Sequence, residues 1–134
     1  MKAEEYLQQI EKIDCIILNK LREREQWEDM AKSITSQMGG ERVQSSGSKE
    51  KMANAVVEVV EIDKQIQMYK DLKKEVISVI ERLNVKEYDF AHKVYVQHLT
   101  LREVAKQEGK SYTWATNMNK AVKRNVQTIL DGRG

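Results

Sequence analysis

One apolar stripe, running from Met52 to Leu83, restricts the possible folds of this chain more than any other feature of the sequence. Its members recur at alternating steps of three and four residues, and only the lysine is polar: Met52, Ala55, Val59, Ile62, Ile66, Tyr69, Lys73, Val76, Ile80 and Leu83. At about 1.5 Å per residue, this helix is about 48 Å long. A single helix cannot bury such a stripe, so the sequence requires a second long helix beside it.

The segment from Ala3 to Met38 supplies that second helix, because neither glycine nor proline interrupts it. Its apolar residues occur in two phases, which are separated near residues 22–26: Tyr6, Leu7, Ile10, Ile13, Ile17 and Leu21, then Trp27, Met30, Ile34 and Met38. We therefore predict a long antiparallel helical hairpin, of coiled-coil type, and expect a homo-oligomer that the same long helices of a second chain complete.

Two residues of the first helix raise separate questions. Asp14 falls on the apolar seam, where it could fix the register of the hairpin or point to water at its open end, and we expect the second. Cys15 is the only cysteine and lies among isoleucines. It is expected to be a core side chain rather than a nucleophile, a zinc ligand or half of a disulfide.

A glycine- and serine-containing segment, residues 39–51, interrupts the helical pattern and predicts a flexible loop. Its glycines also suggest a phosphate-binding loop. However, six residues separate Gly40 from Gly47, and Ser48 rather than lysine follows Gly47. The nucleotide-binding motif is therefore excluded.

A weak break at Asn84 and Val85 divides the chain into two predicted domains, the hairpin over residues 1–84 and a DNA-binding domain over 85–134. A third helix is outlined by Tyr88, Ala91, Val94, Tyr95 and Leu99. We expect it to support the helices that follow, because two short helices alone bury too little apolar surface to fold.

The segment from Thr100 to Val126 has the sequence signals of a helix-turn-helix. Thr100 and Glu103 form a capping box, in which each side chain satisfies a backbone N–H at the start of a helix. Gly109 ends that helix after about two turns by adopting the left-handed conformation. Ser111 then caps a second helix, and the small residues Ala105 and Ala115 let the two helices cross closely.

Charge and polarity place the binding surface on the second of these helices. Residues 101–134 contain seven Lys/Arg and three Asp/Glu, although the whole chain has a net charge of only +2. The predicted DNA-binding residues combine hydrogen-bonding side chains for base edges with cations for phosphates. They are Ser111, Tyr112, Thr113, Thr116, Asn117, Lys120, Lys123 and Arg124.

The segment from Tyr88 to Leu130, with its Leu99–Ala105 start, Gly109 and Ser111–Met118, resembles region 4 of the sigma-70 family. The whole chain is similar to small sigma-like proteins of phages and prophages of Gram-positive bacteria, related to ArpU-type regulators. The resemblance implies binding to promoter DNA, with RNA polymerase as a further partner. The chain departs from region 4 at Tyr112–Asn117, where that region usually presents charged or strongly polar side chains.

Other functional classes find little support in the sequence. His92 and His98 are six residues apart, on different faces of a helix, so no metal site is expected. No nucleophile has a neighbouring base, so we expect neither an enzyme nor a cofactor. Without an apolar span or leader, the protein is expected to be cytoplasmic.

These observations favour a sequence-specific regulator that binds double-stranded DNA. Two alternatives remain: a coiled-coil adaptor that binds RNA polymerase or another phage protein, and a small terminase-type subunit for DNA packaging.

Overall fold

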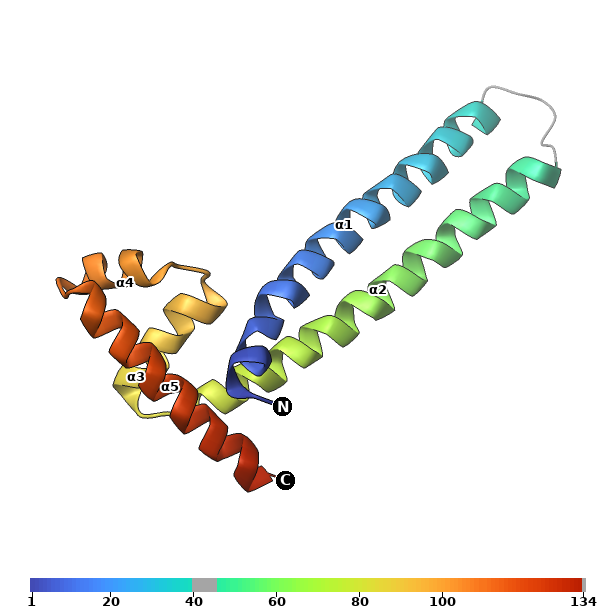
Figure 1. Ribbon diagram of the computed structural model, residues 1–134. Helices are drawn as coiled ribbons and strands as arrows, with labels where there is room; N and C mark the ends of the chain where they lie inside the picture. Colours follow the sequence, from blue (N-terminus) through green and yellow to red (C-terminus); the bar gives the residue numbers. More distant parts are fainter. Residues whose placement is uncertain (40–45, 134) are drawn as a thin grey trace. The chain divides into compact units, whose positions relative to one another are not determined.

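The computed structural model describes the backbone of residues 1–39 and 46–133, and the side chains of residues 1–33 and 49–132. Every regular element within these ranges is helical, so the predicted all-α class is confirmed (Figure 1). The elements are α1 (Ala3–Gly39), α2 (Ser46–Ile80), α3 (Val85–Ala91), the short π-helix η1 (His92–Val96), α4 (Leu101–Glu108) and α5 (Tyr112–Arg133).

The loop predicted over residues 39–51 is wrong in its last part, because α2 already begins at Ser46. Lysine and glutamate at positions 49–51 are good helix formers, and they favour an earlier start of the helix than the serines indicated. The remaining loop positions, 40–45, lie outside the described residues.

The chain divides into two compact units. Unit 1 consists of Met1–Asp14 and Asp71–Gly134, and unit 2 consists of Cys15–Lys70. The first turns of α1 and the last turns of α2 therefore belong to the same unit as α3, η1, α4 and α5. This packing division differs from the predicted domain boundary between residues 84 and 85.

Unit 1 has one apolar core, to which five helices contribute buried side chains. These are Ala3, Leu7 and Ile10 of α1, Val76, Val79 and Ile80 of α2, Phe90 and Ala91 of α3, Val104 and Ala105 of α4, and Ala115, Val122 and Val126 of α5. The predicted third helix corresponds to α3 followed by η1, in which the Gln97 N–H donates to the His92 carbonyl at 2.9 Å. This five-residue step is the hydrogen-bond pattern of a π-helix.

In unit 2, α1 and α2 lie side by side, and Arg24 of α1 pairs with Asp63 of α2 at 2.6 Å. The buried face of α2 follows the predicted stripe through Ala55, Ile62 and Ile66. On α1, by contrast, Leu21 is 47% exposed. The inward-facing side of α1 therefore changes before Leu21, earlier than the predicted change near residues 22–26.

The partial burial of Trp27 accounts for this early change of the inward-facing side of α1. Lys20 and Arg24 precede Trp27 by seven and three residues, so they lie on the same helix face and are partly buried with it. The prediction that Cys15 is a core side chain is also wrong, because Cys15 is exposed. Ile13 and Ile17, two positions before and after it, face inward instead.

The prediction that Asp14 points to water is wrong. Asp14 instead joins three segments of unit 1. Lys73 Nζ donates to Asp14 Oδ1 at 2.6 Å, and His98 Nε2 donates to Asp14 Oδ2 at 2.7 Å. Since a carboxylate only accepts, His98 Nε2 must carry the proton. Burial acts to raise the pKa of Asp14, but hydrogen bonds from Lys73 and His98 together outweigh it and lower that pKa.

This cluster explains the two polar residues that interrupt the apolar stripes of the long helices. Asp14 and Lys73 pair with each other, so neither leaves an unpaired charge in a partly buried position. His98 adopts a left-handed backbone conformation, with φ of 62°, just before the N-cap of α4. Such a conformation is strained for a non-glycine residue, and the bond to Asp14 helps to hold it.

The ends of α4 have the caps that the sequence predicts. The Glu103 N–H donates to Thr100 Oγ1 at 3.1 Å, whereas the Glu103 carboxylate accepts from the Thr100 hydroxyl rather than from its backbone. Gly109 has φ of 65°, and the Lys110 N–H returns to the Ala105 carbonyl at 2.8 Å. This is a Schellman closure, for which the left-handed glycine is required.

Replacing Asp14 with asparagine should lower the free energy of unfolding by about 1 kcal/mol at neutral pH. Asparagine is uncharged and has only one acceptor oxygen, so in this partly exposed site it cannot accept from both Lys73 and His98 as the carboxylate does. Urea titrations followed by circular dichroism would measure it. Asp29→Asn, at an exposed position of α1, is the matched control. The pKa of Asp14 is lower in the folded protein than in the unfolded chain, so its stabilising effect is present at higher pH and is lost as the carboxylate becomes protonated. The difference in unfolding free energy between the variant and wild type should therefore shrink below about pH 4. A difference that persists at pH 2 would contradict this role.

Replacing Gly109 with alanine should cost about 1 kcal/mol, and valine should cost more, because both disfavour positive φ. No atom lies within 4 Å of a Cβ built at this position, so the cost is one of backbone conformation rather than of space. Gly109→Asn is the matched control, since asparagine tolerates the left-handed region. Melting temperatures would rank the variants, and equal values for asparagine and valine would show that this conformation is not retained in solution.

Candidate nucleic-acid interface

The start of α5 is fixed by its N-cap. The Trp114 N–H donates to Ser111 Oγ at 3.1 Å, which satisfies one backbone donor of the first turn. Ser111 was predicted as both a cap and a DNA-binding residue. In the structure its hydroxyl oxygen is engaged within the chain.

Two side chains of α5, one on either side of its buried face, form hydrogen bonds that hold the helix in its orientation. The Tyr95 hydroxyl donates to Asn119 Oδ1 at 2.5 Å, and burial raises the pKa of Tyr95 to about 12. Asn125 Nδ2 donates to both oxygens of Glu87, at 2.8 and 2.9 Å. Since each bond joins α5 to a different element, η1 or α3, rotation of α5 about its axis would break them.

Four of the predicted binding residues form a single exposed stripe along α5: Thr113, Asn117, Lys120 and Arg124. Their steps of four, three and four residues place them on one helix face. Within the part of the chain that the structure describes, none of these four side chains makes a hydrogen bond or an ion pair. We call this set the α5 stripe. It offers one hydroxyl, one amide and two cations to a ligand.

The other predicted residues of α5 lie outside the stripe. Tyr112 has its ring beneath the Arg102 guanidinium, whose central carbon is 4.7 Å from the ring centre. The Thr116 hydroxyl donates to the Thr113 carbonyl at 2.9 Å. Lys123 is partly buried and lies 3.6 Å from a carboxylate oxygen of Glu4. The structure therefore separates Lys123 from Lys120 and Arg124, although the sequence grouped all three as phosphate contacts.

Three further cations, on α4 and in the connection to α5, were missed as individual site residues. Arg102 and Lys106 are exposed on α4, one helical turn apart, and Lys110 is exposed in the connection between α4 and α5. Their spacing on the polar face of α4 could have identified the first two, because residues four apart share a helix face. The local excess of cations favours a polyanionic ligand.

The described residues contain no cluster of three or more His, Cys, Asp or Glu side chains that could hold a metal ion. In the described part of the chain, no helix has both the length and the apolar character to span a membrane. The α5 stripe could bind a ligand through hydrogen bonds from Thr113 and Asn117 and through the charges of Lys120 and Arg124.

Comparisons of the chain with protein-family models, with curated proteins and with solved structures give no match. Function has therefore to be inferred from the geometry and chemistry of the site itself.

Proposed function

We propose that the chain is a cytoplasmic, sequence-specific regulator of transcription, of phage type, that binds double-stranded DNA. In this proposal α4 and α5 act as a helix-turn-helix similar to sigma region 4, and α1 and α2 act as an antiparallel coiled-coil hairpin. One observation carries the proposal: the α5 stripe is exposed, unused within the described chain, and composed of side chains that read bases and bind phosphates.

The order of residues along the stripe suggests a division of labour. Thr113 and Asn117 lie on the early turns of α5, which is the part of a recognition helix that reaches base edges in a major groove. Asparagine can form two hydrogen bonds with adenine. Lys120 and Arg124 follow one and two turns later and suit phosphates, as do Arg102 and Lys106 on α4.

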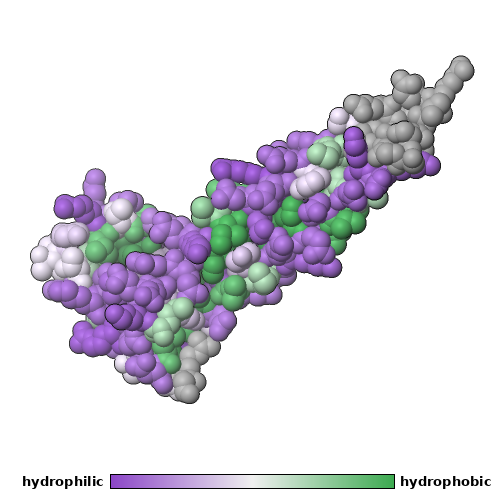
Figure 2. All heavy atoms as spheres, turned by 45° about the vertical axis from the view of Figure 1, so that its right-hand side comes forward, coloured by the Kyte–Doolittle hydropathy of each residue, from purple (hydrophilic) through white to green (hydrophobic). Residues whose placement is uncertain are grey.

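An adaptor that binds RNA polymerase or another phage protein is the second candidate. Exposed apolar side chains of unit 2 favour it, including Leu18, Leu21, Val57, Val60 and Met68. Figure 2 shows hydrophobic side chains among hydrophilic ones along the face of α1 and α2 that it displays. Apolar surface of this kind is typical of helices that assemble with a protein partner.

A second copy of the chain is the partner that we propose for this apolar surface. Leu18 and Leu21 are 50% and 47% exposed and lie three residues apart on α1, so they face outward together. Dimerisation of a helix-turn-helix protein presents two reading helices to two half-sites of DNA. The assembly would thus raise both affinity and specificity.

Selection from random duplex DNA should return a defined motif, and Asn117→Ala should change which sequences bind. The expected loss of discrimination is about 1–3 kcal/mol at the base pair that it reads. Lys120→Ala and Arg124→Ala should weaken all sequences alike and each reduce the salt dependence by about one unit, because each removes one phosphate contact. Affinities on selected and scrambled duplexes at several salt concentrations would measure both effects.

Two lysines serve as controls in this experiment. Lys74→Ala removes an exposed charge from α2 that is not part of the α5 stripe, and should leave affinity and salt dependence unchanged. Lys123→Ala should have a smaller effect than Lys120→Ala, because Glu4 partly neutralises Lys123. If Asn117→Ala kept the full specificity ratio, or if no motif were enriched, the proposed reading helix would be wrong.

If the apolar surface of α1 joins two copies, the double variant Leu18→Gln, Leu21→Gln should sediment as a smaller species than wild type. Its helicity should be unchanged, because both side chains are exposed and glutamine is a good helix former. Val85→Gln is the control, since Val85 is 83% exposed but lies in unit 1. A wild-type chain that remains monomeric across the concentration range would exclude the assembly and leave DNA binding untouched.

A further inference from the structure

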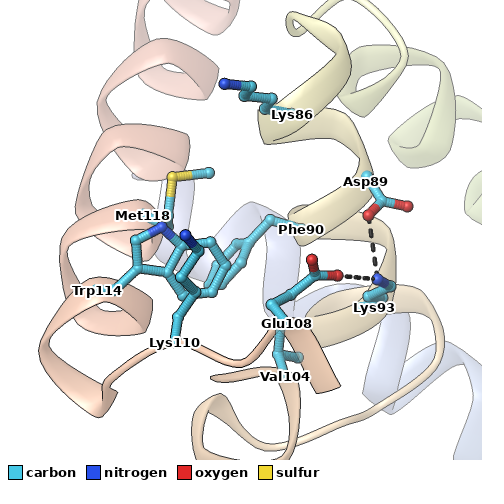
Figure 3. A pocket seen from close by; sticks show the side chains of 9 residues that line it. All are labelled: Lys86, Asp89, Phe90, Lys93, Val104, Glu108, Lys110, Trp114 and Met118. Carbon is cyan, nitrogen blue, oxygen red and sulfur yellow. Dashed lines mark hydrogen bonds and ion pairs between the residues drawn. The ribbon is translucent and has the colours of Figure 1, made fainter. Parts of the chain in front are cut away.

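A pocket of about 270 Å³ lies among α3, α4 and α5 of unit 1. Figure 3 shows the side chains that line it: Lys86, Asp89, Phe90, Lys93, Val104, Glu108, Lys110, Trp114 and Met118. No residue of the α5 stripe lines the pocket. Of the cations assigned above to the candidate interface, only Lys110 lines the pocket, so the ligand of the pocket can be argued separately from the α5 stripe.

The apolar wall of the pocket is firmly held. The rings of Trp114 and Phe90 meet edge to face, with their centres 5.7 Å apart and their planes at 86°. Phe90 and Val104 are 2% and 1% exposed, so the core fixes both of them. Trp114 and Met118 are only partly buried and lie one turn apart on α5. They provide an indole and a thioether, both of which pack well against an aromatic ring.

Two of the three lysines at the pocket have no partner among the residues that the structure describes. Lys93 is held between Asp89, at 3.1 Å, and Glu108, at 2.6 Å, and these hydrogen bonds raise the pKa of Lys93 (Figure 3). The two carboxylates are thereby engaged by one ammonium group. Lys86 and Lys110 then leave the rim positively charged beside an apolar wall.

We propose that this pocket binds a small aromatic carboxylate, with its ring against Trp114 and Met118 and its carboxylate at Lys86 or Lys110. An anion is favoured because the rim lysines are the charges without partners. An aromatic body is favoured because the wall is built from two rings and a thioether. The volume lies just below the range of drug-sized sites, about 300–1,000 Å³, and so suits a ligand of one or two rings.

Trp114 provides a direct probe of this site. The chain has two tryptophans, and the second, Trp27, lies in unit 2. In a Trp27→Phe variant, which keeps an aromatic ring at that position, fluorescence excited at long wavelength reports Trp114 alone. Phenylacetate is the test ligand, and phenylacetamide and acetate are matched compounds that lack the charge and the ring respectively. Sodium chloride holds the ionic strength constant.

Phenylacetate should give a saturable change in Trp114 fluorescence, with half-saturation at a concentration at least fivefold lower than for either matched compound. Lys86→Gln with Lys110→Gln should weaken phenylacetate at least fivefold, while Lys74→Gln should leave it unchanged. Circular dichroism should be the same for all variants, because these lysines are exposed. Equal responses to phenylacetate and acetate, or full binding to the double lysine variant, would overturn the proposal. Neither result would depend on whether the chain binds DNA.

Discussion

The shared core of unit 1 is the constraint on which the rest of the candidate site depends. Helix α4 has eight residues, and only Val104 and Ala105 among them are buried. Such a helix cannot fold on the surface that it buries with α5 alone. Its stability also depends on α3 and η1, and on Leu7 and Ile10 of α1 and the last turns of α2, which complete the same core. The long helices are thus part of unit 1 as well as of unit 2.

This shared core also determines what α5 can present to a ligand. One face of α5 is buried through Ala115, Val122 and Val126, and its flanks are fixed by the bonds of Asn119 and Asn125 to neighbouring helices. The face opposite the core is then exposed by default. Because packing fixes the backbone of α5, ligand binding at the α5 stripe would cost conformational entropy in the side chains but little in the backbone.

Local features of the candidate site could be predicted from the sequence, whereas long-range pairings could not. The Thr100 and Ser111 caps and the Gly109 turn depend on residues a few positions apart, and the structure confirms them. Asp14 meets Lys73 and His98 across 59 and 84 positions, and no periodicity encodes such contacts. Lys123 was grouped with the phosphate contacts for the same reason, since its neighbour Glu4 lies at the other end of the chain.

The geometry of a single helix also explains how the two proposed sites can coexist. Successive residues of α5 turn by about 100°, so Trp114 and Met118 lie on a different face from Asn117 and Lys120. An aromatic acid against Trp114 would leave the α5 stripe uncovered, but a carboxylate paired with Lys110 would place its charge in the connection between α4 and α5. Coupling between the sites would therefore be electrostatic rather than steric. Such coupling weakens with ionic strength, whereas direct competition for one surface does not.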